Sequence, residues 1–186
     1  MPDKTVPKPE ELRLLSQARK GDPGAQRRLY DSLAPKMFSV CLRYMGDRES
    51  AADVLQDGFV TLFSKLDSFS EMGSFEGWAR KIFVNTALMA LRKTNILKES
   101  EDIDSAWNVC ENGADAIQDI GYKDLVRMIG ELPAGFRTVF NMYVVEGYSH
   151  KDIALALGIS ENTSRSQLQR ARVILQGKIK SLNEKR

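Results

Sequence analysis

Hydrophobic residues along this chain recur three and four positions apart, the spacing that gathers them on one face of an α-helix. No stretch alternates apolar and polar residues in the manner of β-strands joined by hairpin turns. The pattern therefore predicts an all-α fold. The expected helices cover residues 9–20, 23–44, 49–66, 74–93, 122–131, 134–145, 150–157 and 161–180.

Two local signals refine the second of these helices. Asp22 is followed by Pro23, which predicts an aspartate N-cap with proline at the first helical position. Pro35 lies inside the same helix, and because proline lacks a backbone N–H we expect a bend or an interruption there.

The helical pattern stops in one internal segment, ESEDIDSAWNVCENGADAIQD, which covers residues 99–119. It is acidic, has no periodicity, and contains Trp107 as its one sizeable anchor. We interpret it as a linker. The chain of 186 residues is long enough for two small helical modules, each with its own core. The expected organisation is a first module over 1–98, an acidic linker over 99–121 and a second module over 122–186.

Charge is unevenly distributed along the chain, although the total is only +2. Residues 1–100 carry a net of +3, residues 101–124 a net of −6 and residues 125–186 a net of +5. The positive charge of the last block lies within 161–186. Basic terminal helices are typical of nucleic-acid-binding proteins, but charged surface helices are common in other proteins too.

Several classes of protein are disfavoured by composition. No run of about 18 apolar residues is present, so we expect no membrane span and no membrane contact, and the N-terminus has no apolar signal-peptide core. Cys41 and Cys110 form no CxxC pair, and one histidine is too few for a zinc site, so we expect two reduced thiols, no metal and no cofactor. Nothing assembles a nucleophile with a base, so no catalytic residue is expected, and His150 is interpreted as an exposed residue of a first helical turn.

The strongest local signal is SHKDIALALGISENTSRSQLQRAR, residues 149–172. Ser149 and Asp152 have the spacing of a capping box, which begins a short helix. Gly158 permits the positive φ of a tight turn, and Ser160 is placed to cap the next helix. Together these residues predict a helix-turn-helix.

The second helix of this motif has two distinct faces. The inner face is expected to consist of Ser164, Leu168, Ala171 and Leu175. Ser164 stands where Val or Ile is usual, which weakens the packing, but a buried serine hydroxyl can bond back to the carbonyl four residues earlier. The outer face and its flanks carry side chains that can read base edges or neutralise phosphates: Asn162, Arg165, Ser166, Gln169 and Arg170. The alternative, an unrelated antiparallel helix hairpin, would not require the caps, the glycine turn and the basic face together.

The helix over 49–66 also has two faces. Its apolar stripe comprises Leu55, Phe59, Leu62, Phe63 and Leu66. The opposite face carries Asp53, Asp57, Val60 and Ser64, with Gln56 beside it. Without further context this second face reads as an ordinary solvated surface. Asp53 and Asp57 could bind a metal, but no histidine or third carboxylate lies near them in sequence.

The helix over 74–93 mixes aromatic and cationic residues. Phe75, Ile82, Phe83, Thr86 and Met89 are expected on one side, and Trp78, Lys81, Asn85 and Arg92 on the adjoining stripe. Aromatic rings interleaved with cations suit single-stranded DNA, because bases stack and phosphates pair with the cations. Phe75 and Trp78 could equally belong to the core.

Three stretches together resemble the extracytoplasmic-function (ECF) sigma factors, over nearly the whole chain. DVLQDGF (residues 53–59) resembles the polymerase-docking part of sigma region two. LDSF and GSFEGWARKIFVNTALMALRK (66–69 and 73–93) resemble the part that melts and reads the minus-ten element. LPAGFRTVFNMYVVEGYSHKDIALALGISENTSRSQLQRAR (132–172) resembles region four.

The resemblance implies a role for each group of residues. Polymerase binding, at the β′ clamp, would fall to Asp53, Gln56, Asp57 and Val60. Binding of the melted minus-ten element would fall to Phe69, Ser70, Glu71, Met72, Ser74, Trp78, Lys81 and Asn85. Recognition of the duplex minus-thirty-five element would fall to Lys151, Asn162, Thr163, Arg165, Ser166, Gln169, Arg170 and Arg172.

The resemblance also implies the partners and the setting. We expect core RNA polymerase (β′ clamp and β flap), promoter DNA as duplex and as melted non-template strand, and an anti-sigma factor, all in the cytoplasm. Two rival hypotheses stay open at this point. One is a polymerase-independent helix-turn-helix regulator, which would form a symmetric dimer. The other is a helical enzyme that uses a metal at Asp53 and Asp57.

Overall fold

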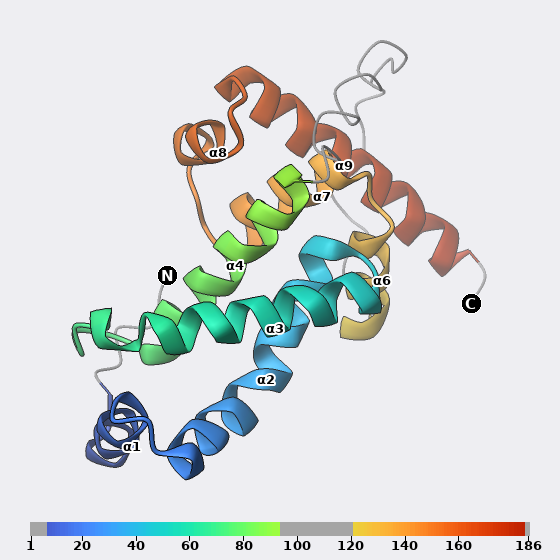
Figure 1. The fold of residues 1–186 in the computed structure, drawn as a ribbon. Helices are drawn as coiled ribbons and strands as arrows, with labels where there is room; N and C mark the ends of the chain where they lie inside the picture. The colour runs from blue at the N-terminus through green and yellow to red at the C-terminus, as the bar shows by residue number, and fades with distance from the viewer. Residues whose placement is uncertain (1–6, 94–120, 185–186) are drawn as a thin grey trace. The chain divides into compact units, whose positions relative to one another are not determined.

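A computed structural model describes residues 7–93 and 121–184 of the chain (Figure 1). All regular structure in these two ranges is helical, as the apolar spacing predicts. The expected linker, with Trp107 and Cys110, lies largely outside them. The chain divides into two compact units: one comprises Met1–Leu42 and Asp47–Ala90, and the other comprises Arg43–Gly46 and Leu91–Arg186.

The first unit contains α1 (Pro9–Arg19), α2 (Pro23–Met45, as far as Leu42), α3 (Arg48–Ser64), the short 3-10 helix η1 (Leu66–Ser68) and α4 (Phe75–Lys93, as far as Ala90). Phe59 of α3 lies at the centre of its core. The Phe59 ring centroid is 4.5 Å from that of Tyr30 on α2 and 5.1 Å from that of Phe83 on α4. Aromatic packing of this kind therefore joins three of the helices.

The start of α2 confirms the predicted cap, because the Ala25 N–H donates to the Asp22 carboxylate at 2.6 Å. At Pro35 we expected a bend or an interruption; an interruption is wrong, since α2 is one helix from Pro23 to Met45. Pro35 is exposed. The carbonyl that loses its intrahelical partner to a proline can then be hydrated, which makes the proline tolerable within the helix.

The buried side of α4 differs in part from the expected one. Phe75 and Phe83 are buried as predicted, but Met89 is 67% exposed. Val84, Ala87, Leu88 and Leu91 are the buried residues of its second half. The buried face of the second half of α4 is therefore not the one that the sequence predicted. Phe75 belongs to the core, which decides one of the alternatives left open by the sequence.

The second unit contains α6 (Tyr122–Gly130), α7 (Ala134–Phe140), the π-helical segment η3 (Asn141–Val145), α8 (His150–Leu157) and α9 (Glu161–Asn183). Figure 1 shows α8 beside the first turns of the long helix α9. One buried cluster holds α6, α7 and α9 together: Met128, Ile129, Leu132, Phe136, Ala171, Leu175 and Ile179. Residues far along α9 thus serve the same core as those near its middle.

Candidate nucleic-acid interface

The start of α8 is fixed by the capping box that the sequence predicts. The Ser149 hydroxyl oxygen accepts from the Asp152 N–H at 3.1 Å, and the Asp152 carboxylate accepts from the Ser149 N–H at 3.4 Å. Both are backbone donors that an uncapped helix would leave without a partner. The first helix of the motif therefore has a defined beginning.

The turn between α8 and α9 is also as predicted. Gly158 adopts φ 71° and ψ 30°, in the left-handed region, and its N–H donates to the Ala154 carbonyl at 2.9 Å. Ser160 then begins α9 by accepting from the Thr163 N–H at 2.9 Å. A left-handed glycine that ends α8 and a serine that caps α9 two residues later form a tight turn, which confirms the helix-turn-helix.

The inner face of α9 is confirmed as well: Ser164, Leu168, Ala171 and Leu175 are all buried. Gln167 is buried too, which the sequence pattern did not indicate. On α8, Ile153 is completely buried beneath this face. Apolar packing thus sets which side of α9 remains for a ligand.

The buried hydroxyl of Ser164 has a side-chain partner that the sequence did not indicate. It lies 2.9 Å from Nδ1 of His150, in place of a bond back to the carbonyl of Ser160. The His150 ring also stacks on Tyr143, with centroids 4.4 Å apart. The interpretation of His150 as an exposed residue is therefore wrong, because its imidazole is half-buried and satisfies a buried serine.

Burial lowers the pKa of His150, and the positive charge of nearby Arg165 lowers it further. A neutral imidazole is thus favoured in the folded protein. In that form one ring nitrogen can accept and the other can donate, so the contact with Ser164 does not require a charge.

The outer face of α9 presents most of the residues predicted to read duplex DNA. Asn162, Arg165, Gln169 and Arg172 are exposed, as is Lys151 on α8. Arg165 is held by Glu161, with Nη2 and the carboxylate oxygen 2.9 Å apart. Exposed pairs of this kind contribute little to stability, so the Arg165 guanidinium can exchange this partner for a phosphate or a base.

Three residues of the same predicted set are less exposed. The Thr163 hydroxyl lies 2.9 Å from that of Ser160, and the Ser166 hydroxyl donates to the Thr163 carbonyl at 3.0 Å. Arg170 has a buried Nη1, and its guanidinium lies 6.0 Å from the centre of the Phe136 ring. Arg170 therefore packs along the module, whereas Arg165 and Arg172 project from it.

On α3 the residues predicted to bind polymerase form one continuous exposed strip. Asp53, Gln56, Asp57 and Val60 lie at spacings of three, one and three residues, and each is exposed. Val60 is 66% exposed although it is apolar. The buried side of α3 consists of Ala51, Val54, Gly58, Phe59 and Leu62. The strip is therefore an acidic surface with an apolar residue at one end.

The predicted minus-ten residues lie in a loop and on the adjoining face of α4. Phe69 is buried, and its ring centroid is 5.2 Å from that of Phe75 and 5.3 Å from that of Trp78. Trp78 is half-buried over this cluster. Ser74 caps α4 by accepting from the Gly77 N–H at 3.1 Å. Phe69 and Ser74 thus shape the loop, in addition to any contact they make with DNA.

The rest of this predicted set faces solvent. Ser70, Glu71 and Met72 are exposed in the loop, and Lys81 and Asn85 are exposed on α4. Met72 is 87% exposed at the loop tip. The structure therefore brings together, within one unit, polar, apolar and cationic side chains beside a half-buried tryptophan.

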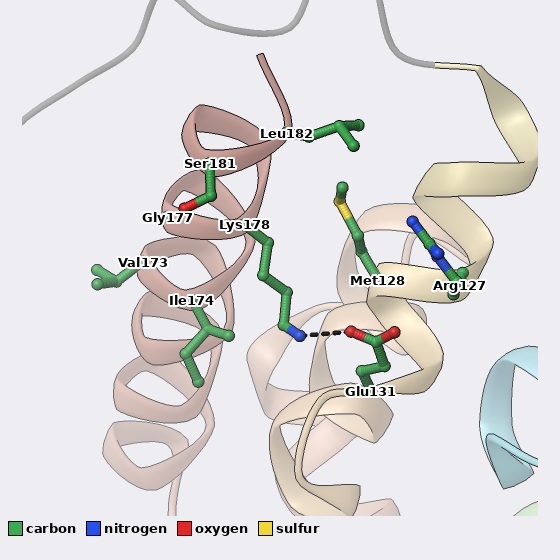
Figure 2. A pocket seen from close by; sticks show the side chains of 9 residues that line it. All are labelled: Arg127, Met128, Glu131, Val173, Ile174, Gly177, Lys178, Ser181 and Leu182. Atoms are coloured by element: carbon green, nitrogen blue, oxygen red, sulfur yellow. Dashed lines mark hydrogen bonds and ion pairs between the residues drawn. The ribbon is translucent and has the colours of Figure 1, made fainter. Parts of the chain in front are cut away.

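A feature that the sequence did not indicate is a groove of about 510 Å³ between α6 and α9 (Figure 2). Its walls are lined by Met128, Val173, Ile174 and Leu182, with Arg127, Glu131, Gly177, Lys178 and Ser181 around them. Figure 2 shows Lys178 reaching across the groove to Glu131. Hydrogen bonding to Lys178 lowers the pKa of Glu131.

Two features of the described residues bear on the alternatives left open by the sequence. Residues 7–93 and 121–184 contain no group of three His, Cys, Asp or Glu side chains placed to hold a metal ion, so Asp53 and Asp57 have no third ligand there. In the same two ranges no helix combines the length and apolar character needed to cross a bilayer.

Comparison with known families follows the same division of the chain. The family described as Sigma-70 region 2 matches residues 29–95, and the one described as Sigma-70, region 4 matches residues 122–175. The first match contains α3 and α4, and the second contains the helix-turn-helix.

Several curated proteins are similar to the chain. It is 30% identical to the ECF RNA polymerase sigma factor SigE of Mycolicibacterium smegmatis over 144 residues. These aligned residues cover 75% of this chain and 55% of that protein. It is 24% identical to the ECF RNA polymerase sigma factor SigW of Bacillus subtilis, over 90% of this chain and 96% of the relative. It is 27% identical to the ECF RNA polymerase sigma-E factor of Escherichia coli K12, over 91% and 94%.

One solved structure shares the fold: the sigma factor RpoE in complex with the anti-sigma factor NepR from Bartonella quintana. The likeness has a TM-score of 0.50 at 23% identity and covers 83% of this chain and 96% of that one. Together, the two matched regions and the relatives show that this chain belongs to the ECF subfamily of sigma-70-type sigma factors.

Proposed function

We propose that this chain directs core RNA polymerase to promoters by binding DNA at two places: melted DNA through its first unit and duplex DNA through its second. The observation that carries the proposal is that each unit keeps an exposed set of polar and cationic residues on helices whose other side is buried. Two modest interactions on one chain reinforce each other through effective concentration.

Docking on the polymerase falls to the acidic strip of α3, which comprises Asp53, Gln56, Asp57 and Val60. Its carboxylates complement a basic partner helix, for which the resemblance implies the clamp of the β′ subunit. Val60 supplies an apolar contact at the end of the strip. The second unit would bind the β flap, and the groove between α6 and α9 is the surface we assign to it. That groove uses the C-terminal half of α9 and leaves the N-terminal half for DNA.

Binding of the melted non-template strand is assigned to the loop over residues 69–74 and to α4. Extracting a base from the stack costs a few kcal/mol, and a pocket that accepts one base makes this step selective. Trp78 offers an aromatic face, Lys81 a cation and Asn85 an amide that can bond to a base edge. Strand opening follows because binding of the extracted base stabilises the melted state.

Binding of duplex DNA is assigned to the outer face of α9. Asn162 and Gln169 can bond to base edges in the major groove, and Arg165, Arg172 and Lys151 can bond to phosphates or bases. Asn162, Arg165 and Gln169 lie on neighbouring turns of α9, as a recognition helix requires.

No covalent step is assigned to this chain, because polymerisation belongs to the enzyme it accompanies. The setting is then the cytoplasm, where bacterial polymerase works. An anti-sigma factor that holds the chain inactive is a further proposed partner, which rests on the family resemblance alone.

The proposal is tested by separating the docking function from the DNA functions. Asp57→Ala should weaken binding to purified core polymerase, measured by fluorescence anisotropy of the labelled chain, without changing thermal stability. Asp31→Ala is the matched control, since Asp31 is an exposed carboxylate on α2 that pairs with Arg27. Equal loss of core binding in both variants, or in neither, would refute docking through the α3 strip.

A further inference from the structure

The segment over residues 66–71, which comprises η1 and the start of the loop after it, is tied to the end of α1 by a single arginine. Nε of Arg19 donates to the Leu66 carbonyl at 3.2 Å, and Nη2 donates to the Phe69 carbonyl at 2.7 Å. Nη1 pairs with the carboxylate of Glu71. One side chain therefore holds three points of a loop that lies about fifty residues further along the chain. Its own exposure is only 22%.

The loop contains a backbone conformation that is unfavourable unless other residues stabilise it. Glu71 adopts φ 60°, and it is the one residue other than glycine with positive φ among residues 7–93 and 121–184. That conformation is unfavourable for a side chain with a Cβ and persists where the surroundings enforce it. Gly73 follows with φ 103°. The contact between Arg19 and the Glu71 carboxylate lies directly at the strained residue.

The geometry of the guanidinium explains why this position carries arginine. Three donors in one plane can reach two carbonyls and a carboxylate at once, and all three are charge-assisted. A lysine ammonium is a compact group and cannot span these three acceptors together. Arg19 also lies before residue 29, where the match to Sigma-70 region 2 begins.

We propose that Arg19 is a positioning residue for minus-ten selectivity: it fixes the shape of the loop over residues 66–71, so that Ser70 and Met72 are presented to the melted strand in one arrangement. The inference rests on the proposed function of that loop. Arg19 acts through the loop backbone, and its pairing with Glu71 also neutralises a carboxylate that would repel DNA.

The test compares base selectivity of holoenzymes assembled with each variant. The probes are single-stranded oligonucleotides that carry the minus-ten element with each of the four bases at every position. The measured quantity is the ratio of binding affinities for the preferred base and the next best base at each position. Arg19→Lys should reduce this ratio by about tenfold at one or two positions, the loss expected when hydrogen bonds to charged groups are broken. Arg27→Lys, an exposed arginine on α2, is the matched control and should keep the ratio.

A second pair of variants separates the two ways in which Arg19 could act. Glu71→Gln removes the carboxylate charge and keeps the two carbonyl contacts of Arg19, so its measured selectivity is the baseline with which the double variant is compared. The double variant Arg19→Lys with Glu71→Gln should be as unselective as Arg19→Lys alone. Restored selectivity in the double variant would overturn the proposal, because Arg19 would then only mask a charge.

Two further readouts distinguish positioning from general support of the fold. Binding of Arg19→Lys to core polymerase and to duplex minus-thirty-five DNA should be unchanged. If these fall in parallel with minus-ten selectivity, Arg19 is only a fold residue and the inference fails. If wild-type holoenzyme itself shows no minus-ten selectivity, the proposed function of the loop fails first. If the wild type is selective and Arg19→Lys is equally so, the inference alone fails.

Discussion

Gly58 on α3 lies against the ring of Phe83 on α4, and this contact allows a quantitative test of the fold of the first unit. A Cβ added at Gly58 would lie 2.3 and 2.4 Å from Cδ1 and Cε1 of Phe83. Phe83 is fully buried and packs edge-on against Phe59, so its ring has little room to move. Gly58→Ala therefore overpacks a closed core.

The size of the effect follows from two opposing contributions. Overpacking a core costs about 1–3 kcal/mol, and contacts well under 3 Å place this site in the upper part of that range. Replacing glycine by alanine inside a helix returns at most about 1 kcal/mol. We expect Gly58→Ala to lower the free energy of unfolding of the first unit by about 1–2 kcal/mol.

Urea unfolding followed by the fluorescence of Trp78 measures this effect. A Trp107→Phe background leaves Trp78 as the sole tryptophan reporter. With a denaturant slope of about 2 kcal/mol per molar, the middle of the usual range for urea, the midpoint should fall by roughly 0.5–1 M.

The matched control is Gly77→Ala on α4. Its added Cβ meets Ser74 at an ordinary 3.6 Å, and we expect a gain of about 0.4–1 kcal/mol. If Gly58→Ala is as stable as the wild type, the described packing of α3 on α4 is wrong.

Three other expectations concern the second unit. Ser149→Ala removes the capping box of α8 and should cost about 1 kcal/mol of stability in thermal unfolding, whereas Ser149→Asp should restore most of it; equal melting of all three would contradict the cap. Because the folded pKa of His150 is lowered, the unfolded chain binds more protons just below pH 6.5, so stability should fall as pH drops through that region, and His150→Gln should lose less stability over the same interval. Parallel pH curves for the two proteins would rule this out. Gln169→Ala should cost about 1–3 kcal/mol on the preferred minus-thirty-five duplex and much less on altered sequences, as measured by binding titrations of holoenzyme; a uniform loss would remove Gln169 from base reading.

The helix-turn-helix could be predicted from the sequence because its determinants are local. Ser149, Asp152, Gly158 and Ser160 act within a few residues of themselves, through caps and a left-handed turn, so sequence spacing is enough to identify them. The apolar face of α9 follows from the helical period in the same way. These features were confirmed without correction.

The features that sequence reasoning missed depend on distant partners. His150 meets Ser164 across fourteen residues, and Arg19 meets the loop at 66–71 across about fifty, so neither contact has a local signature. Met89 was misplaced because periodicity identifies an apolar stripe but not where neighbouring helices stop covering it. A polar residue at an inner-face position, such as Ser164, was the one signal that a buried partner was needed.

The roles assigned to the three exposed surfaces stay predictions, and one measurement tests them together. Purified core RNA polymerase would be incubated with this chain on a library of randomised promoters, and the transcribed templates would be sequenced. We predict that the chain co-purifies with core enzyme and enriches templates that share two separated elements, a duplex one upstream and a melted one near the start site. Failure of core enzyme to retain the chain, or an unchanged distribution of transcribed templates, would contradict the account.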